Sequence, residues 1–264
     1  MPAIMGILNI TPDSFSDGGR YLARDAAVFR AREMVAQGAQ YIDIGGESSR
    51  PGAQPVSIQE ELDRVIPVLE TLRGEVDATI SIDTNKLAVM KAAVAAGASF
   101  INDVNGLSDP EARVFVSQER LPVCIMHRKG VSETMQKKPE YAQPVIEEIR
   151  SFFETRVRDC IAAGIAREAI FLDPGIGFGK TLDHNLSILR ELAQLKEMGF
   201  PILLGVSRKQ FIGTILQKPV EERCVGGLAV ALWAVLQGVS VIRTHDVKET
   251  AEVFQILEVI QGLA

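Results

Sequence analysis

Short apolar runs alternate with amphipathic stretches along the whole chain. The runs are aliphatic or β-branched and lack clean polar alternation, as expected of strands that are buried on both faces. They predict strands at Ile4–Asn9, Tyr41–Ile44, Thr79–Asp83, Phe100–Asp103, Pro122–His127, Ile170–Asp173, Ile202–Ser207 and Val241–Thr244. The intervening stretches predict helices at Ala23–Gln37, Ile58–Arg73, Lys86–Ala96, Pro110–Glu119, Pro144–Ala163, Asn185–Met198, Glu221–Gln237 and Val247–Ile260. Repeated strand–helix units of this kind predict an α/β fold, a (β/α)8 TIM barrel; an open doubly wound sheet, which usually has fewer strands, is the alternative.

Capping residues mark several of the predicted helices. Ser57 with Glu60 forms a capping box, and Asp183 is the expected N-cap before His184. Glycines suited to a left-handed C-terminal turn follow four helices, at Gly38, Gly97, Gly164 and Gly199.

Polar residues follow nearly every predicted strand. In a (β/α)8 barrel the chemistry lies at the carboxyl ends of the strands. The residues at these ends are Asn9, Asp83, Asn102, Asp103, His127, Asp173, Ser207, Arg208, Lys209, Arg243 and His245. Any one of them alone is as easily a cap or a turn residue, but their repetition predicts a site at this end. Two long loops there, Asn9–Gly19 and Gly45–Gly52, mix glycine with hydroxyl residues and predict mobile lids.

The segment Phe171–Lys180 delivers Asp173 from an apolar strand into a glycine-rich turn. A phosphate-binding P-loop would need glycine where Pro174 stands, and the dinucleotide pattern would need glycine where Lys180 stands. Neither nucleotide motif is met, so Asp173 needs another explanation.

Composition narrows the class of protein. The 264 residues are 47% hydrophobic and 23% charged, without a linker-like stretch, which favours one domain over residues 1–264. A net charge of −6 without clustered Lys and Arg argues against nucleic-acid binding. Three unpaired cysteines and the lack of a membrane-length apolar run predict a cytoplasmic protein.

The strand-end residues fall into two chemical kinds. Asp83, Asn102 and Asp173 suit the amino edge of a planar heterocycle, although the carboxylates could instead be a general acid–base pair. Cationic and donor residues, namely Arg243, His245, Lys209 and Arg50, suit a phosphate or diphosphate. Scattered histidines disfavour zinc, whereas magnesium bridged by a diphosphate stays open, with Asn9 as its single protein ligand.

The chain resembles the dihydropteroate synthases of the bacterial folate pathway, and the match is collinear from Met5 to the C-terminal helix. The matching motifs start at Met5 (MGILNITPDSFSDGG), Asp43 (DIGGESSRPG), Ser81 (SIDT), Ile101 (IND), Met126 (MH), Asp173 (DPGIGFGK), Ser207 (SRK) and Arg243 (RTHD). The resemblance implies a transferase that condenses 6-hydroxymethyl-7,8-dihydropterin diphosphate with 4-aminobenzoate, giving 7,8-dihydropteroate and diphosphate. It also implies magnesium, a homodimer and competition by sulfonamides.

Carried onto matching positions, the resemblance assigns each expected site residue a role. The pterin pocket falls on Asp83, Asn102, Met126, Asp173, Gly205 and Lys209. Diphosphate binding falls on Asn9, Arg243 and His245, with magnesium at Asn9. The aminobenzoate side falls on Ser49, Arg50, Pro51, Phe178 and Ser207. The catalytic residues of this set are Asp83, Asp173, Lys209, Arg243 and His245.

Two departures from the family pattern bear on substrate affinity. Ser49 stands where threonine is common, which keeps the hydroxyl but loses a methyl group, and Arg128-Lys129 follow Met126-His127 where many members are less basic. Two alternatives share the barrel and the pterin pocket. A pterin-dependent methyltransferase would have no use for a diphosphate clamp, and a non-catalytic pterin-binding relative would be expected to have degraded loops.

Overall fold

The computed structural model describes residues 2–10, 20–48, 52–131, 134–136 and 139–262. Within these ranges all the predicted strands are present: β1 (Ala3–Asn9), β2 (Tyr41–Gly45), β3 (Thr79–Asp83), β4 (Phe100–Asp103), β5 (Val123–Met126), β6 (Ile170–Asp173), β7 (Leu203–Gly205) and β8 (Val241–Thr244). They form one parallel sheet in the order β6-β5-β4-β3-β2-β1-β8-β7, and a bridge between Leu172 and Ile202 joins β6 to β7. The predicted (β/α)8 TIM barrel is confirmed.

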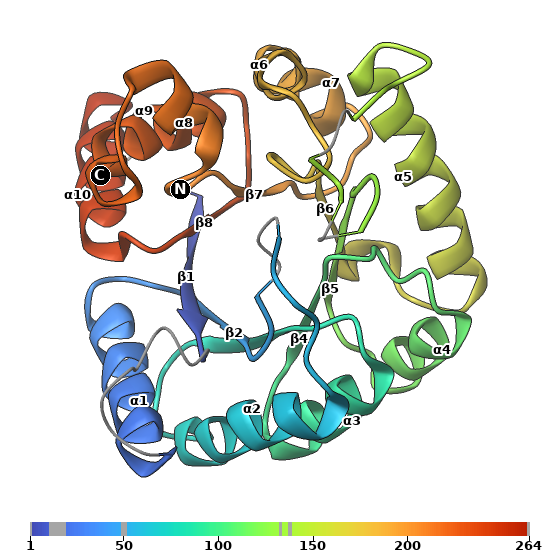
Figure 1. Ribbon diagram of the computed structural model, residues 1–264, viewed down its shortest axis with the longest axis vertical. Coiled ribbons are helices and arrows are strands. Elements are labelled where there is room, and N and C mark those ends of the chain that lie inside the picture. The colour runs from blue at the N-terminus through green and yellow to red at the C-terminus, as the bar shows by residue number, and fades with distance from the viewer. Residues whose placement is uncertain (1, 11–19, 49–51, 132–133, 137–138, 263–264) are drawn as a thin grey trace.

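Helices surround the strands as a ring (Figure 1). Those of the first half are α1 (Arg20–Ala36), α2 (Ile58–Leu72), α3 (Leu87–Ala96), α4 (Pro110–Gln118) and α5 (Val145–Ala162). Those of the second half are α6 (Leu182–Arg190), α7 (Leu192–Lys196), α8 (Gln210–Leu216), α9 (Cys224–Leu236) and α10 (Val247–Ile260). Gly38, Gly97, Gly164 and Gly199 all take positive φ after their helices, as predicted.

The structure corrects three details of the second half. The N-cap of α6 is Thr181, whose hydroxyl accepts from His184 N, so Asp183 lies in the first turn. The single helix predicted at 185–198 is broken at Glu191 into α6 and α7. Close to the break, the Leu189 carbonyl accepts the indole N–H of Trp233 at 2.8 Å, a partner outside the helix. Helix α8 was not predicted, because it is short and follows directly on Lys209.

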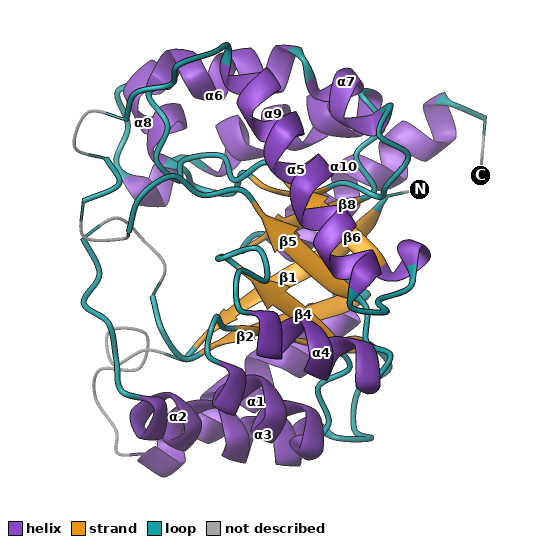
Figure 2. Ribbon diagram, turned by 90° about the vertical axis from the view of Figure 1, so that its right-hand side faces the viewer, coloured by secondary structure: helices purple, strands orange, loops and turns teal. Residues whose placement is uncertain are grey.

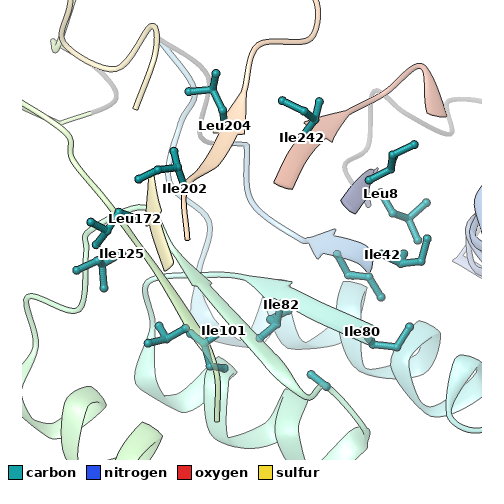
Figure 3. Close-up of a cluster of buried hydrophobic side chains, with 14 of the residues drawn as sticks. Leu8, Ile42, Ile80, Ile82, Ile101, Ile125, Leu172, Ile202, Leu204 and Ile242 are labelled. Atoms are coloured by element: carbon teal, nitrogen blue, oxygen red, sulfur yellow. The ribbon is translucent and has the colours of Figure 1, made fainter. Parts of the chain in front are cut away.

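Strict alternation along the strands separates two environments. Outward-facing side chains such as Leu8, Ile42, Ile82 and Ile242 join the large core between barrel and helices (Figure 3). Inward-facing residues of the strand starts form a small second core of Met5, Phe100, Cys124, Leu203 and Val241, with Tyr41 and Phe171 packed on it. Further along the strands the inward positions are polar, including Asp43, Ser81, Asp83, Asn102, Asp173 and Arg243. The interior of the barrel is therefore filled by apolar side chains near the strand starts and lined by polar side chains towards the carboxyl ends.

The long connecting loops lie on one side of the barrel, at the carboxyl ends of the strands (Figure 2). They run between α8 on one edge of this side and α2 on the other. Polar strand ends and loops thus meet on one face of the molecule, as the barrel prediction requires.

Candidate active site

A row of polar positions crosses the mouth of the barrel. Strand register aligns Asn9 with Gly45, Gly45 with Asp83, and Asp83 with Asn102. Gly45 lies between two of them, since a Cβ there would be in van der Waals contact with Asp83 Cβ at 3.5 Å and with Asn9 Oδ1 at 3.7 Å. Three of the predicted site residues, Asn9 on β1, Asp83 on β3 and Asn102 on β4, therefore lie at one height in the sheet.

A buried carboxylate, Asp43, connects this row to Arg243. Asp43 is fully buried and accepts from Ser81 Oγ at 2.5 Å, Asn102 Nδ2 at 2.9 Å and Arg243 Nε at 2.6 Å. The guanidinium of Arg243 also donates through Nη2 to Asp83 Oδ2 at 2.8 Å. A charge removed from water needs such partners, so the network fixes the orientation of Arg243 and Asn102.

Burial makes the two predicted catalytic carboxylates weak acids. Desolvation raises the pKa of Asp83 to about 7, with the neighbouring Asp43 charge adding to the rise and Arg243 opposing it. Desolvation also raises the pKa of Asp173. Smaller effects lower it, among them the Gly175 N–H, which donates to Asp173 Oδ1 at 2.7 Å, and the charge of Lys209. Both groups thus titrate above the usual range of a carboxyl.

The glycine-rich turn after β6 places Phe178 beside Lys209. Lys209 Nζ lies 4.2 Å from the centre of the Phe178 ring, a cation–π contact, and a Cβ on Gly177 would meet the Lys209 side chain at 3.4 Å. Lys180, at the end of the turn, is 3% exposed and folds back onto His127. The turn therefore brings four cationic or ring groups together: Phe178, Lys180, Lys209 and His127.

The ends of β7 and β8 form a second polar cluster. His245 N donates to Ser207 Oγ at 3.2 Å, and His245 Nδ1 lies 3.1 Å from the same oxygen. Ser207 Oγ donates to Asp246, which is also ion-paired with Arg208. Arg208 takes φ of +57°, a conformation that non-glycine residues seldom adopt, and it turns the chain between Ser207 and Lys209.

A cavity of about 900 Å³ lies at this face. Seven predicted site residues line it: Asn9, Phe178, Gly205, Ser207, Lys209, Arg243 and His245. Asp83, Asn102, Met126 and Asp173 are buried and are not among the residues that line the cavity, although Asp83 accepts a hydrogen bond from Arg243, which does line it. This volume is at the upper end for small-molecule sites, and it leaves room for more than one ligand.

The remaining predicted residues have different outcomes. Ser49, Arg50 and Pro51 lie outside the described residues, as does most of the predicted lid at Asn9–Gly19. Met126 is in register with Asp173, and Gly205 with Arg243, so both lie next to predicted catalytic residues. Among the residues that the structure describes, no group of three or more His, Cys, Asp or Glu could hold a metal ion.

Two residues of the site were missed from the sequence. Asp43 interrupts the apolar run Tyr41–Ile44, and a lone acid at an inward position was a usable signal. Lys180 stands in a segment that fails both nucleotide motifs, and no sequence signal indicates that its side chain folds back into the protein.

The barrel and its polar mouth are those of a pterin-binding enzyme. The family model described as "Pterin binding enzyme" matches residues 5–245. The dihydropteroate synthase of Escherichia coli strain K12 is 47% identical over 257 residues, covering 97% of this chain and 91% of that protein.

Solved structures of dihydropteroate synthases are also similar to this chain. The Yersinia pestis dihydropteroate synthase with a sulfonamide drug complex superposes with a TM-score of 0.93 at 47% identity, covering 99% of this chain and 94% of that one. The Xanthomonas albilineans dihydropteroate synthase with 4-aminobenzoic acid has a TM-score of 0.93 at 41% identity, covering 100% and 94%. This chain belongs to the dihydropteroate synthase family and is a transferase. In the described residues no helix is long and apolar enough to cross a membrane.

Proposed function

We propose that this barrel condenses 6-hydroxymethyl-7,8-dihydropterin diphosphate with 4-aminobenzoate, releasing diphosphate and forming 7,8-dihydropteroate. The observation that carries the proposal is the pairing of Asp83 with Arg243 at the wall of the cavity. In this contact the Asp83 carboxylate, an acceptor suited to a pterin, meets the Arg243 guanidinium, a donor suited to a diphosphate. The aminobenzoate bound by the Xanthomonas relative supports the second substrate.

Pterin binding is assigned to the inward polar positions. Asp83, Asn102 and Asp173 would accept from or donate to the amino edge of the ring, and Lys209 would orient it by a hydrogen bond. Met126 and Gly205, the register neighbours of Asp173 and Arg243, would line its faces.

Diphosphate binding is assigned to Asn9, Arg243 and His245, all in the cavity wall. Arg243 binds Asp43 and Asp83 through Nε and Nη2, and a guanidinium has five N–H donors, so further donors remain for phosphate oxygens. Asn9 offers an amide oxygen that fits magnesium, since this ion keeps several waters and often takes one or two protein oxygens. When bound, magnesium would neutralise charge on the leaving diphosphate.

The chain's own groups would support an early break of the bond between the pterin methylene and the diphosphate oxygen. The leaving group takes the electron pair, and the anionic Asp83 and Asp173 favour the positive charge that develops on the pterin. The arylamine nitrogen then forms the new C–N bond and releases a proton to solvent. Phe178 and Ser207, with Ser49, Arg50 and Pro51, would place the amine.

The assay is diphosphate release by purified protein supplied with magnesium, the pterin diphosphate and 4-aminobenzoate. Release should require both substrates, should fall on chelation by EDTA, and should fall when a sulfonamide competes with 4-aminobenzoate. Absence of 7,8-dihydropteroate at high enzyme concentration would contradict the proposed reaction.

We also propose a location and an oligomeric state for the enzyme. It acts as a single-domain, cytoplasmic protein and as a homodimer, with no membrane or nucleic-acid partner. An apolar surface supports the dimer. Val225, Trp233 and Leu236 of α9 and Ile256, Val259 and Ile260 of α10 are 46–78% exposed, and the two helices contact each other.

A further inference from the structure

The glycine-rich turn is held by hydrogen bonds with side chains outside it. Gln136 donates its side-chain amide to Gly177 O, and Tyr141 Oη donates to Gly179 O at 2.9 Å. Asn185, which is 3% exposed, accepts from Gly177 N at 2.8 Å. The backbone conformation around Phe178 is therefore fixed by several independent contacts.

Lys180 makes further contacts that hold the turn, through an amino group that is buried in the protein. Its Nζ lies 3.0 Å from His127 Nδ1 and donates to His127 O at 3.3 Å and to Phe178 O at 3.1 Å. One amino group thus ties the end of β5 to the residue whose ring lies under Lys209. Lys180 also lines the cavity, so this tie lies at the site itself.

The partner of Lys180 is a neutral imidazole. Burial, and then the charge of Lys180, lower the pKa of His127 to about 2, so His127 can accept through Nδ1 at neutral pH. Burial also lowers the pKa of Lys180 to about 7. Burying a lysine amine costs free energy, which its three polar contacts with His127 and Phe178 offset in part.

We propose that Lys180 is a positioning residue, whose amino group holds the Phe178 carbonyl against the end of β5 and so sets the Phe178 ring for the second substrate. The inference rests on the proposed function, because it takes Phe178 as a contact of 4-aminobenzoate. Lys180 acts through Phe178 and does not contact the reacting atoms.

The test is Lys180→Met, which keeps the length of the side chain and removes its three polar contacts. The KM for 4-aminobenzoate should rise about tenfold or more, and by more than the KM for the pterin diphosphate, on which Lys180 acts only through its charge interaction with Asp173. The thermal midpoint should fall, because the carbonyl oxygens of His127 and Phe178 lose their Lys180 donor. KM values are therefore compared at a temperature at which both enzymes are folded. Lys91→Met, at an exposed lysine on α3, is the matched control and should match the wild type.

A double-mutant cycle with Phe178→Ala separates positioning from a merely structural role. If Lys180 acts through Phe178, Lys180→Met should add little to the KM of the Phe178→Ala enzyme. Additive effects, or equal increases in both KM values, would overturn the inference. Lys180→Gln, which retains an uncharged donor, replaces Lys180→Met in the cycle if the methionine variant does not fold.

Wild-type turnover in the same assay distinguishes a failure of the proposed function from a failure of the inference about Lys180. If the wild type releases no diphosphate with both substrates present, the proposed function is wrong. If the wild type is active and Lys180→Met has wild-type KM values, only the inference about Lys180 is wrong.

Discussion

A single carboxylate, Asp43, organises the interior of the barrel mouth. It lies at an inward position of β2, and its three donors come from β3, β4 and β8. A fully buried carboxylate without partners would be costly, whereas this one is satisfied and fixes side chains on three other strands. The charge of Arg243 is thus held between Asp43 and Asp83 before any ligand arrives.

Asp83 should give the enzyme a pH dependence. Because its pKa is raised to about 7, the carboxyl is mostly neutral at pH 6 and mostly anionic at pH 8. If the anion favours the developing pterin cation, wild-type kcat/KM for the pterin diphosphate should rise about tenfold over that interval. Asp83→Asn should flatten this rise and lose most activity at pH 8, as steady-state rates would measure.

The control for that profile is Asp25→Asn, at an exposed acid of α1. Its pH profile should follow the wild type. A pH profile of Asp83→Asn that kept the full rise would assign the titration to another group.

At the scale of elements, the turn after β6 is pressed against the strand before it. Gly175 and Gly179 take φ of +68° and +65°, and a Cβ at either position would overlap a carbonyl oxygen, that of His127 or that of Lys129. The β5 extension and the turn therefore pack backbone to backbone. Glycine is required here by both conformation and space.

Gly179→Ala should destabilise the protein well beyond the cost of its backbone angle. Strain at positive φ adds to a backbone overlap, so the thermal midpoint should fall by about 5–10 °C. Gly74→Ala is the matched control, because Gly74 takes φ of +75° with nothing within 4 Å of the added Cβ. Equal midpoints for the two variants in thermal unfolding would show that the overlap relaxes freely.

At the scale of the whole molecule, large exposed apolar side chains lie on α9 and α10, two helices that contact each other. These helices lie beside α8 in the ring, away from α2 and α3 (Figure 1). Large exposed apolar side chains gathered on neighbouring helices are typical of protein–protein contacts.

Leu236→Glu should dissociate the proposed homodimer. Leu236 is 54% exposed, so the fold should tolerate glutamate, but a carboxylate buried at an interface would be strongly unfavourable. Light scattering at micromolar concentration should give about half the wild-type mass. Phe29→Glu, at a 69% exposed aromatic on α1, should remain dimeric. A monomeric wild type would contradict the proposed dimer.

The sequence by itself determined the alternation of strands and helices, and with it the barrel. Apolar runs bounded by glycine and capping residues are local signals, since each depends on the period and conformational preference of a few residues. The same signals put Asn9, Asp83, Asn102, Asp173 and Arg243 at strand ends, and the fold confirms that these ends share one face. They could not reveal that the Leu189 carbonyl, just before the break at Glu191, accepts a hydrogen bond from Trp233 of α9, a residue 44 positions along the chain.

Only the tertiary structure decided which of these groups meet. Strand register and closure of the sheet bring Arg243 of β8 to Asp43 and Asp83 of β2 and β3, which are 200 and 160 residues away in the chain. The position of Lys180 against His127 was likewise set by packing, across 53 residues. Hydrogen bonds and charge interactions act over a few ångströms, so they depend on distances that the order of residues does not contain.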